Sequence, residues 1–103
     1  MRKLMDLVDL DDRGVFVYFR TPALCRDFMR TAEAEGITFG DGVRPSQRDV
    51  TDIFALHANK TIAYVGAVGH MAFSAGARVR VDYEKYRNGE EDFINGAKLF
   101  RNA

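Results

Sequence analysis

The 103-residue sequence contains a single cysteine, Cys25, and carries no net charge. One cysteine forms neither an intrachain disulfide nor a zinc site built on cysteine ligands. No apolar run approaches ~20 residues, the length of a membrane-spanning helix, and the start of the chain lacks the apolar stretch of a signal peptide. These absences predict a cytoplasmic protein without a membrane partner.

The zero net charge comes from fifteen Lys and Arg residues balanced by fifteen Asp and Glu residues. No overall electrostatic field therefore draws the chain to nucleic acid or to an anionic membrane. Hydrophobic residues make up 47% of the chain, which excludes an intrinsically disordered protein. We expect one domain over residues 1–103, with residues 1–14 as an N-terminal extension and a radius of gyration of about 13 Å.

One long helix and five strands are predicted from local patterns. Residues 15–19 are all β-branched or aromatic, which is typical of a central strand covered on both faces. Thr21 and Pro22 mark the start of a helix over 22–35, whose apolar residues lie on one face and which ends at Gly36. The other strands are expected at 37–39, 53–58, 61–65 and 77–83.

The order of these elements predicts an α+β fold, with one main helix packed on a four- to five-stranded, mostly antiparallel sheet in two layers. Asn59 and Lys60 form the expected tight hairpin turn, in which Asn tolerates the positive φ that such turns need and Lys is less favourable than Gly at the second position. The strand at 77–83 alternates, which places Arg78, Arg80 and Asp82 on its solvent face. Residues 88–103 are predicted to form either a docked C-terminal segment or a tail.

The sequence contains cysteine and histidine, which often act in catalysis, but not in the sequence patterns typical of catalytic or metal sites. Cys25 belongs to the apolar face of the predicted helix, where a free cysteine is a small core residue. His57 and His70 lack a nearby carboxylate pattern typical of a metal site. The glycines from Gly66 onward are not followed by the Lys-Ser/Thr of a phosphate-binding loop. We therefore expect a protein that is not an enzyme and that uses neither a metal nor a cofactor.

Arginine outnumbers lysine by eleven to four. Arginine forms planar, bidentate contacts and is enriched at interfaces. If an open sheet face carries arginines beside an aromatic residue such as Tyr18 or Tyr64, it can bind a protein or a single nucleic-acid strand. An ordinary solvated face with ion pairs to Asp is the other interpretation. The predicted binding residues are Arg44, Arg48, His70, Arg78, Arg80 and Tyr83.

The amount of apolar sequence also bears on association. The strands and the Phe-bearing C-terminal segment offer more apolar surface than one helix can cover. The second face of the sheet must then be covered by the terminal segments or by a second copy of the chain. Self-association is therefore a second expected kind of interaction.

The arrangement of these motifs resembles small α+β proteins encoded by phages and mobile elements of Firmicutes. The resemblance covers residues 15–86 and rests on the aromatic strand at 16–19, on Thr21-Pro22, on the glycine-rich turn at 36–42, on the hairpin at 53–65 and on the closing segment at 79–86. Phe39 stands where those proteins often have tryptophan. The resemblance implies a protein that binds a host protein, such as a defence nuclease.

These observations together predict a small, non-enzymatic protein-interaction module that acts through its sheet face and through the 40–50 and 66–77 loops. A nucleic-acid-binding accessory protein that uses the Arg-rich helix, loop and last strand is the alternative. A small enzyme is the third hypothesis, and it would need a pocket in which a histidine faces a carboxylate.

Overall fold

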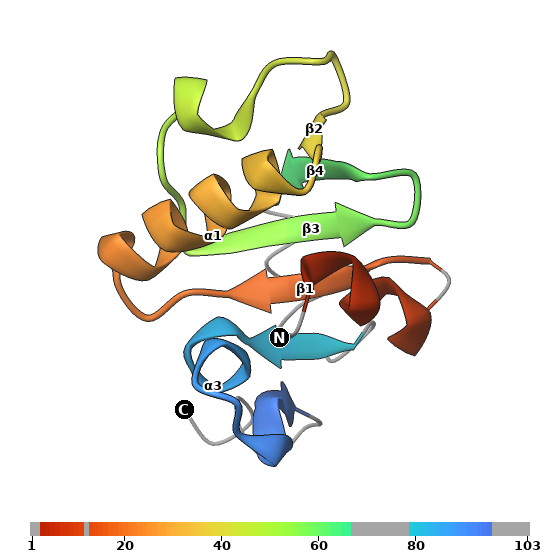
Figure 1. The fold of residues 1–103 in the computed structure, drawn as a ribbon, viewed down its shortest axis with the longest axis vertical. Helices are drawn as coiled ribbons and strands as arrows, with labels where there is room; N and C mark the ends of the chain where they lie inside the picture. Colours follow the sequence, from red (N-terminus) through yellow and green to blue (C-terminus); the bar gives the residue numbers. More distant parts are fainter. Residues whose placement is uncertain (1–2, 12, 67–78, 96–103) are drawn as a thin grey trace.

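The computed structural model describes residues 3–11, 13–66 and 79–95. Within these ranges the chain forms a mixed sheet with the strand order β2-β4-β3-β1-β5-β6. The helix α1 and the short 3₁₀ helix η1 lie together on one face of this sheet (Figure 1). The Cα radius of gyration, 12.5 Å, agrees with the expectation from chain length.

The predicted α+β class, with one main helix on a sheet, is confirmed. The strands are β1 (Val15–Tyr18), β2 (Thr38–Phe39), β3 (Ile53–His57), β4 (Thr61–Tyr64), β5 (Arg80–Asp82) and β6 (Ile94–Asn95). The α-helices are α1 (Pro22–Ala34) and α3 (Tyr83–Arg87). The 3₁₀ helices are η1 (Leu4–Leu10), η2 (Pro45–Gln47) and η3 (Glu91–Phe93).

The sheet mixes parallel and antiparallel pairs around β1. The strand β1 pairs antiparallel with β3 and parallel with β5. Antiparallel pairs also join β3 to β4 and β5 to β6, and a parallel pair joins β2 to β4. Val15 and Val17 of β1 are fully buried and Phe16 on the opposite face is 5% exposed, so the predicted central strand is confirmed.

The helix α1 begins and ends as the sequence predicts. The amide of Leu24 donates a hydrogen bond of 3.2 Å to the Thr21 hydroxyl, which caps the first turn in front of Pro22. Gly36, just past the end of the helix, has a φ of 81°, a conformation that suits glycine. The buried face consists of Cys25, Phe28, Met29 and Ala32.

The predicted N-terminal extension packs on the same face of the sheet as α1. Leu4 and Leu7 are 2% and 1% exposed and belong to the main core. The amides of Leu4 and Met5 donate hydrogen bonds of 2.8 and 3.2 Å to the Glu35 carboxylate, which ties η1 to the end of α1. Residues 3–11 therefore help to cover the first face of the sheet.

The central part of the second face of the sheet is also buried. Phe16, Ile53 and Ala55 form a separate cluster there with Val65. The expectation that Arg80 of β5 faces solvent is wrong, because Arg80 is 2% exposed. Arg80 lies beside Phe16 of β1 on this face of the sheet, and both side chains are buried. Self-association stays a prediction.

One local prediction differs from the structure. The segment expected as strand up to Tyr83 turns into the helix α3 at that residue, because the Asp82 carboxylate accepts a hydrogen bond from the Lys85 amide and caps it. The expected hairpin joins β3 to β4, and Lys60 in its turn has a positive φ of 64°. Residues 88–95 dock on the rest of the domain, because the ring of Phe93 packs against that of Tyr86 with the two ring centroids 4.7 Å apart.

Candidate interaction groove

The six predicted binding residues are not brought to one place. Arg44 is exposed and Arg48 is half-buried, and both flank η2 beside α1. Arg80 is buried on the second face of the sheet, and Tyr83 is 1% exposed at the start of α3. His70 and Arg78 lie outside the described residues. Arg44 and Arg48 therefore stay predicted binding residues, whereas Arg80 is buried, and residues 67–77 of the predicted 66–77 loop lie outside the described ranges.

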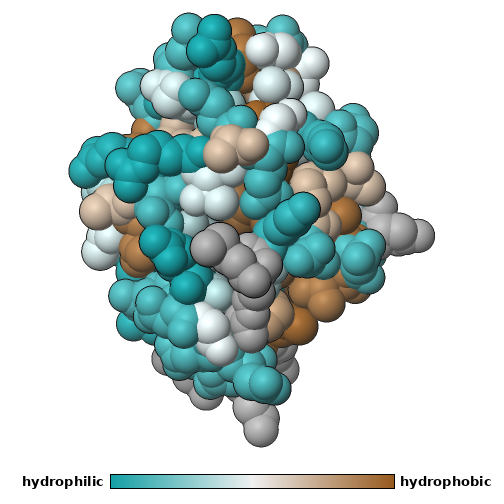
Figure 2. All heavy atoms as spheres, viewed as in Figure 1, coloured by the Kyte–Doolittle hydropathy of each residue, from teal (hydrophilic) through white to brown (hydrophobic). Residues whose placement is uncertain are grey.

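A groove of 530 Å³ lies between α1 and the segment that follows β2. Val50, which is half-buried, supplies the accessible apolar part of its floor, whereas Met29, also in the lining, is only 3% exposed. The surface over this region of the molecule is largely hydrophilic (Figure 2). The other groove-lining residues are Arg26, Arg30, Ser46, Arg48 and Asp49. The groove thus combines an apolar floor with a mostly polar rim.

The groove wall opposite α1 is held at several points. Ser46 donates from its hydroxyl and its amide to the Glu33 carboxylate of α1, at 2.6 and 3.2 Å. The Tyr64 hydroxyl of β4 donates to the Asp49 carbonyl at 2.5 Å. The Thr51 amide lies 3.4 Å from the Cys25 sulfur, which it contacts as a donor. These contacts fix the shape of the groove before any partner binds.

Arg48 is held in the same wall by two kinds of interaction. Its guanidinium donates to the Asp41 carboxylate, and its Cζ atom lies 4.6 Å from the centroid of the Phe39 ring. Hydrogen bonds from Arg48 lower the pKa of Asp41, and hydrogen bonds from Ser46 lower that of Glu33. Both carboxylates therefore stay ionised at neutral pH.

Arg26 and Arg30 of α1 have fewer contacts from their side chains than Arg48 on the opposite wall of the groove. Arg26 has no ion pair or hydrogen bond from its side chain to any residue in the described ranges. The Arg30 side chain is 72% exposed and lies 3.5 Å from Asp27. The lining itself carries three guanidinium groups and the carboxylate of Asp49, and Arg48 and Arg30 are paired with Asp41 and Asp27 next to it. Arg26 is therefore the groove arginine whose side chain has no acidic partner among the described residues.

The predicted set omits Arg26 and Arg30, although both belong to the Arg-rich helix. Their spacing of four places them on the same side of α1, and this signal is readable from the sequence. The sequence pattern does not show that the 44–50 segment returns to that side. The Ser46–Glu33 contact supplies this information.

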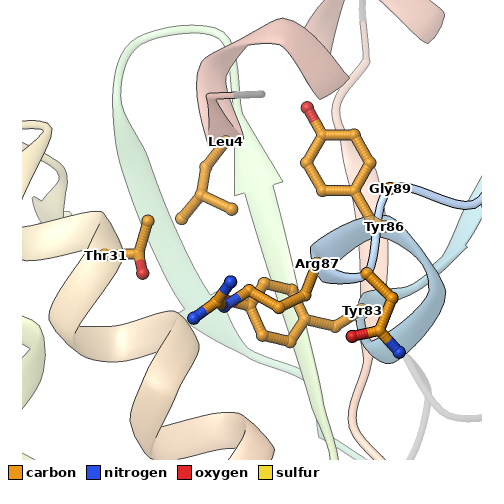
Figure 3. A pocket seen from close by; sticks show the side chains of 7 residues that line it. Leu4, Thr31, Tyr83, Tyr86, Arg87 and Gly89 are labelled. Atoms are coloured by element: carbon orange, nitrogen blue, oxygen red, sulfur yellow. The ribbon is translucent and has the colours of Figure 1, made fainter. Parts of the chain in front are cut away.

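A second cavity, of 510 Å³, opens between α1, α3 and η1 (Figure 3). Asp27 of α1 contacts two of its lining residues, because its carboxylate accepts hydrogen bonds from the Tyr83 hydroxyl at 2.6 Å and from Arg87 Nε at 2.8 Å. Burial raises the pKa of Asp27, but these hydrogen bonds and the charges of Arg87 and Arg30 together lower it overall. Burial and the Asp27 hydrogen bond raise the pKa of Tyr83.

The Asp27→Asn substitution tests this cluster. We expect the free energy of unfolding at pH 7 to fall by about 1–2 kcal/mol, because an amide replaces the charged partner of Tyr83 and Arg87. The folded-state pKa of Asp27 lies below that of the unfolded chain. Its stabilising contribution is therefore present above about pH 4 and is lost as the pH falls through the folded-state pKa.

Urea unfolding of both proteins between pH 7 and pH 2.5 measures this effect. The stability difference between wild type and Asp27→Asn should shrink toward low pH. A difference that stays constant over this range would show that the charge of Asp27 does not contribute.

Side chains with catalytic or metal-binding potential are dispersed in the described residues. Cys25 is buried, which raises the pKa of its thiol and keeps it protonated. No group of three His, Cys, Asp or Glu side chains is arranged to hold a metal ion in the described ranges. No helix within those ranges has the length and apolar character needed to span a membrane.

Comparison of the chain with protein-family models, with curated proteins and with solved structures found no match.

Proposed function

We propose that the protein is a non-enzymatic interaction module that binds an acidic segment of a partner protein in the groove between α1 and η2. The observation that carries the proposal is the set of three groove-lining arginines above an apolar floor. Arg26 and Arg30 are both exposed, and Arg30 lies 3.5 Å from Asp27, while Arg48, held by Asp41, defines the opposite wall. Charge complementarity of this kind gives a protein interface its specificity and its association rate.

The apolar floor indicates what such a segment contains. Val50 can contact an aliphatic side chain of the partner, and the arginines can contact acidic residues on either side of it. Interfaces commonly combine a small apolar centre with a charged rim. On the resemblance to phage and mobile-element proteins, the partner would be a host protein such as a defence nuclease.

The test uses a capped pentapeptide with a central leucine and two acidic residues on each side. Its control replaces the acidic residues with Asn and Gln. We expect the acidic peptide to bind more tightly than its control, with an affinity that falls as salt rises, because exposed ion pairs are screened. Fluorescence anisotropy of labelled peptides measures both affinities.

Charge reversal at Arg26 and Arg30 of α1 tests whether the groove is the surface that binds the peptide. The double substitution Arg26→Glu with Arg30→Glu should weaken binding of the acidic peptide about tenfold or more, since each exposed ion pair contributes up to ~1 kcal/mol. Lys60→Glu is a suitable charge control, because Lys60 is exposed in the hairpin turn at the opposite end of β3 from the groove. Equal losses in both variants would reflect overall charge and would contradict the proposal.

A titration with a six-nucleotide single strand distinguishes the proposed function from the alternative, nucleic-acid binding. Nucleic acid bound more tightly than the acidic peptide, with a steep dependence on salt, would overturn the proposal in favour of nucleic-acid binding. The structure offers that alternative fewer exposed arginines than the sequence predicts, because Arg80 is buried.

A further inference from the structure

The chain carries an acidic segment of its own, with an exposed aliphatic side chain, in η1. Leu10 is 39% exposed, whereas Leu4 and Leu7 of the same 3₁₀ helix are buried. Asp6 and Asp9 are both exposed and lie three residues apart, a spacing that places side chains on one side of a 3₁₀ helix. The end of η1 therefore presents a leucine beside two carboxylates, the combination that the groove is proposed to bind.

These two carboxylates are not neutralised within the described part of the molecule. The Asp6 carboxylate accepts a hydrogen bond of 3.1 Å from the Lys3 amide, which brings no charge. The Asp9 carboxylate has neither a hydrogen bond nor an ion pair with any residue in the described ranges. The next carboxylate, Asp11, is paired with Arg13. Asp6 and Asp9 are thus the charges of η1 that another molecule can neutralise.

The spacing of these carboxylates matches that of the arginines on α1. Three residues of a 3₁₀ helix rise about 6 Å, and the four residues from Arg26 to Arg30 of an α-helix also rise about 6 Å. Arg26 has no acidic partner among the described residues. Arg30 lies 3.5 Å from Asp27, which is also paired with Arg87, so Arg30 can turn to another carboxylate without leaving Asp27 alone.

The acidic groups around the groove decide where such a segment lies. The carboxylates that line the groove or contact its lining residues are those of Asp27, Glu33, Asp41 and Asp49. The first three accept hydrogen bonds from Arg87, Ser46 and Arg48 respectively. Asp49 is exposed on the wall opposite α1, so an acidic segment lies against α1 rather than against that wall. Val50, which is half-buried in the lining, is the apolar surface within its reach.

The helix η1 does not reach the groove of its own molecule. Figure 1 shows η1 and η2 on opposite sides of α1. The amides of Leu4 and Met5 hold η1 at Glu35, just past the end of α1, and the Lys3 carbonyl accepts a hydrogen bond from the Tyr86 hydroxyl. The exposed side of η1 is therefore presented to other molecules.

We propose that the groove binds η1 of a second copy of this chain. Asp6 and Asp9 of one copy pair with the α1 arginines of the other, and Leu10 contacts Val50. This inference rests on the proposed function, because it identifies a segment that the groove takes. A chain without net charge associates here through oppositely charged surfaces, and a host protein competes with η1 for the groove.

Residues 90–94 form a second acidic stretch that serves for comparison. Ile94 is 43% exposed and Glu91 is exposed. However, Asp92 is paired with Lys85, and Ile94 belongs to β6, which pairs with β5. Acidic residues precede Ile94 in the sequence but do not follow it. This stretch is therefore a control for the effects of an exposed acid and an exposed aliphatic side chain.

Sedimentation equilibrium of the wild-type chain measures self-association. At low salt we expect the average mass to rise above the monomer mass as the concentration approaches ~1 mM, with a dissociation constant of about 1 mM or lower. The mass should return to that of the monomer in ~0.5 M salt, because the exposed ion pairs are screened.

Two variants each remove one side of the contact. Asp9→Asn with Leu10→Ser changes η1, and Arg26→Gln with Arg30→Gln changes the groove. Each should weaken self-association about tenfold, the effect of an exposed ion pair together with a small apolar contact. A mixture of the two variants retains one intact contact, between the groove of the first and η1 of the second. The mixture should therefore have a higher average mass than either variant alone at the same total concentration.

Glu91→Gln with Ile94→Ser is the matched control and should associate as the wild type does. The ¹⁵N–¹H correlation spectrum of each variant first shows that it is folded. A wild type that is monomeric at every concentration, an equal loss in the control, or a mixture no heavier than its components would overturn the inference. A monomeric chain that still binds the acidic pentapeptide overturns this inference alone, whereas absence of both kinds of binding overturns the proposed function as well.

Discussion

Replacement of Phe28 by alanine should remove about 3–5 kcal/mol from the free energy of unfolding. Phe28 is fully buried and lies at the centre of the aromatic core between α1 and the sheet. Its ring centroid lies 5.0 Å from that of Phe19 and 5.8 Å from that of Phe54. The substitution removes these ring contacts and leaves a cavity that rigid neighbours fill only in part.

The loss is large because small domains have only about 5–15 kcal/mol of total stability. Urea unfolding followed by circular dichroism measures it, with Phe28→Leu as a comparison that keeps most of the volume. Phe28→Leu should cost clearly less than Phe28→Ala. A loss below about 1 kcal/mol for Phe28→Ala would show that the ring does not occupy the centre of the core.

Reversal of Arg80 to glutamate should destabilise the fold by about 4 kcal/mol or more, or prevent folding altogether. The side chain is 2% exposed and shares its face of β5 with Asp82, which is 1% exposed. The substitution places two acidic groups, two residues apart, in a region that excludes water. Their desolvation and their mutual repulsion both oppose folding.

Two further variants separate charge from packing at this position. Arg80→Met keeps much of the volume without a charge, and it should be less destabilising than Arg80→Glu. Arg44→Glu makes the same charge change at an exposed arginine and should alter stability by less than about 0.5 kcal/mol. An Arg80→Glu protein as stable as the Arg44→Glu protein would contradict the buried position of Arg80.

Local patterns predict the elements of this fold well because the relevant interactions are local. The Thr21 cap, Pro22 and the spacing of the buried residues Cys25, Phe28 and Met29 all lie within the helix that they define. The same holds for the aromatic strand β1 and for the hairpin strands β3 and β4. In contrast, the helix α3 is short and begins directly after a strand, so its few residues give no periodicity to detect.

The environment of a polar residue depends on contacts that the sequence does not display. The alternation of Arg80 with apolar neighbours predicts a solvent-exposed face, but Arg80 lies beside Phe16 on a face of the sheet where both side chains are buried. Asp27 meets Tyr83 and Arg87 from positions 56 and 60 residues away in the chain. The sequence therefore predicts an Arg-rich region, whereas the groove and the cavity require the fold.

The central claim is that an acidic protein segment binds in the groove between α1 and η2. The most direct test is a ¹⁵N–¹H correlation spectrum of the wild-type protein titrated with the acidic pentapeptide. We predict that the largest shift changes fall on residues 26–30 and 44–50. Changes centred instead on β5 and β6, or on the hairpin turn around Lys60, would contradict the claim.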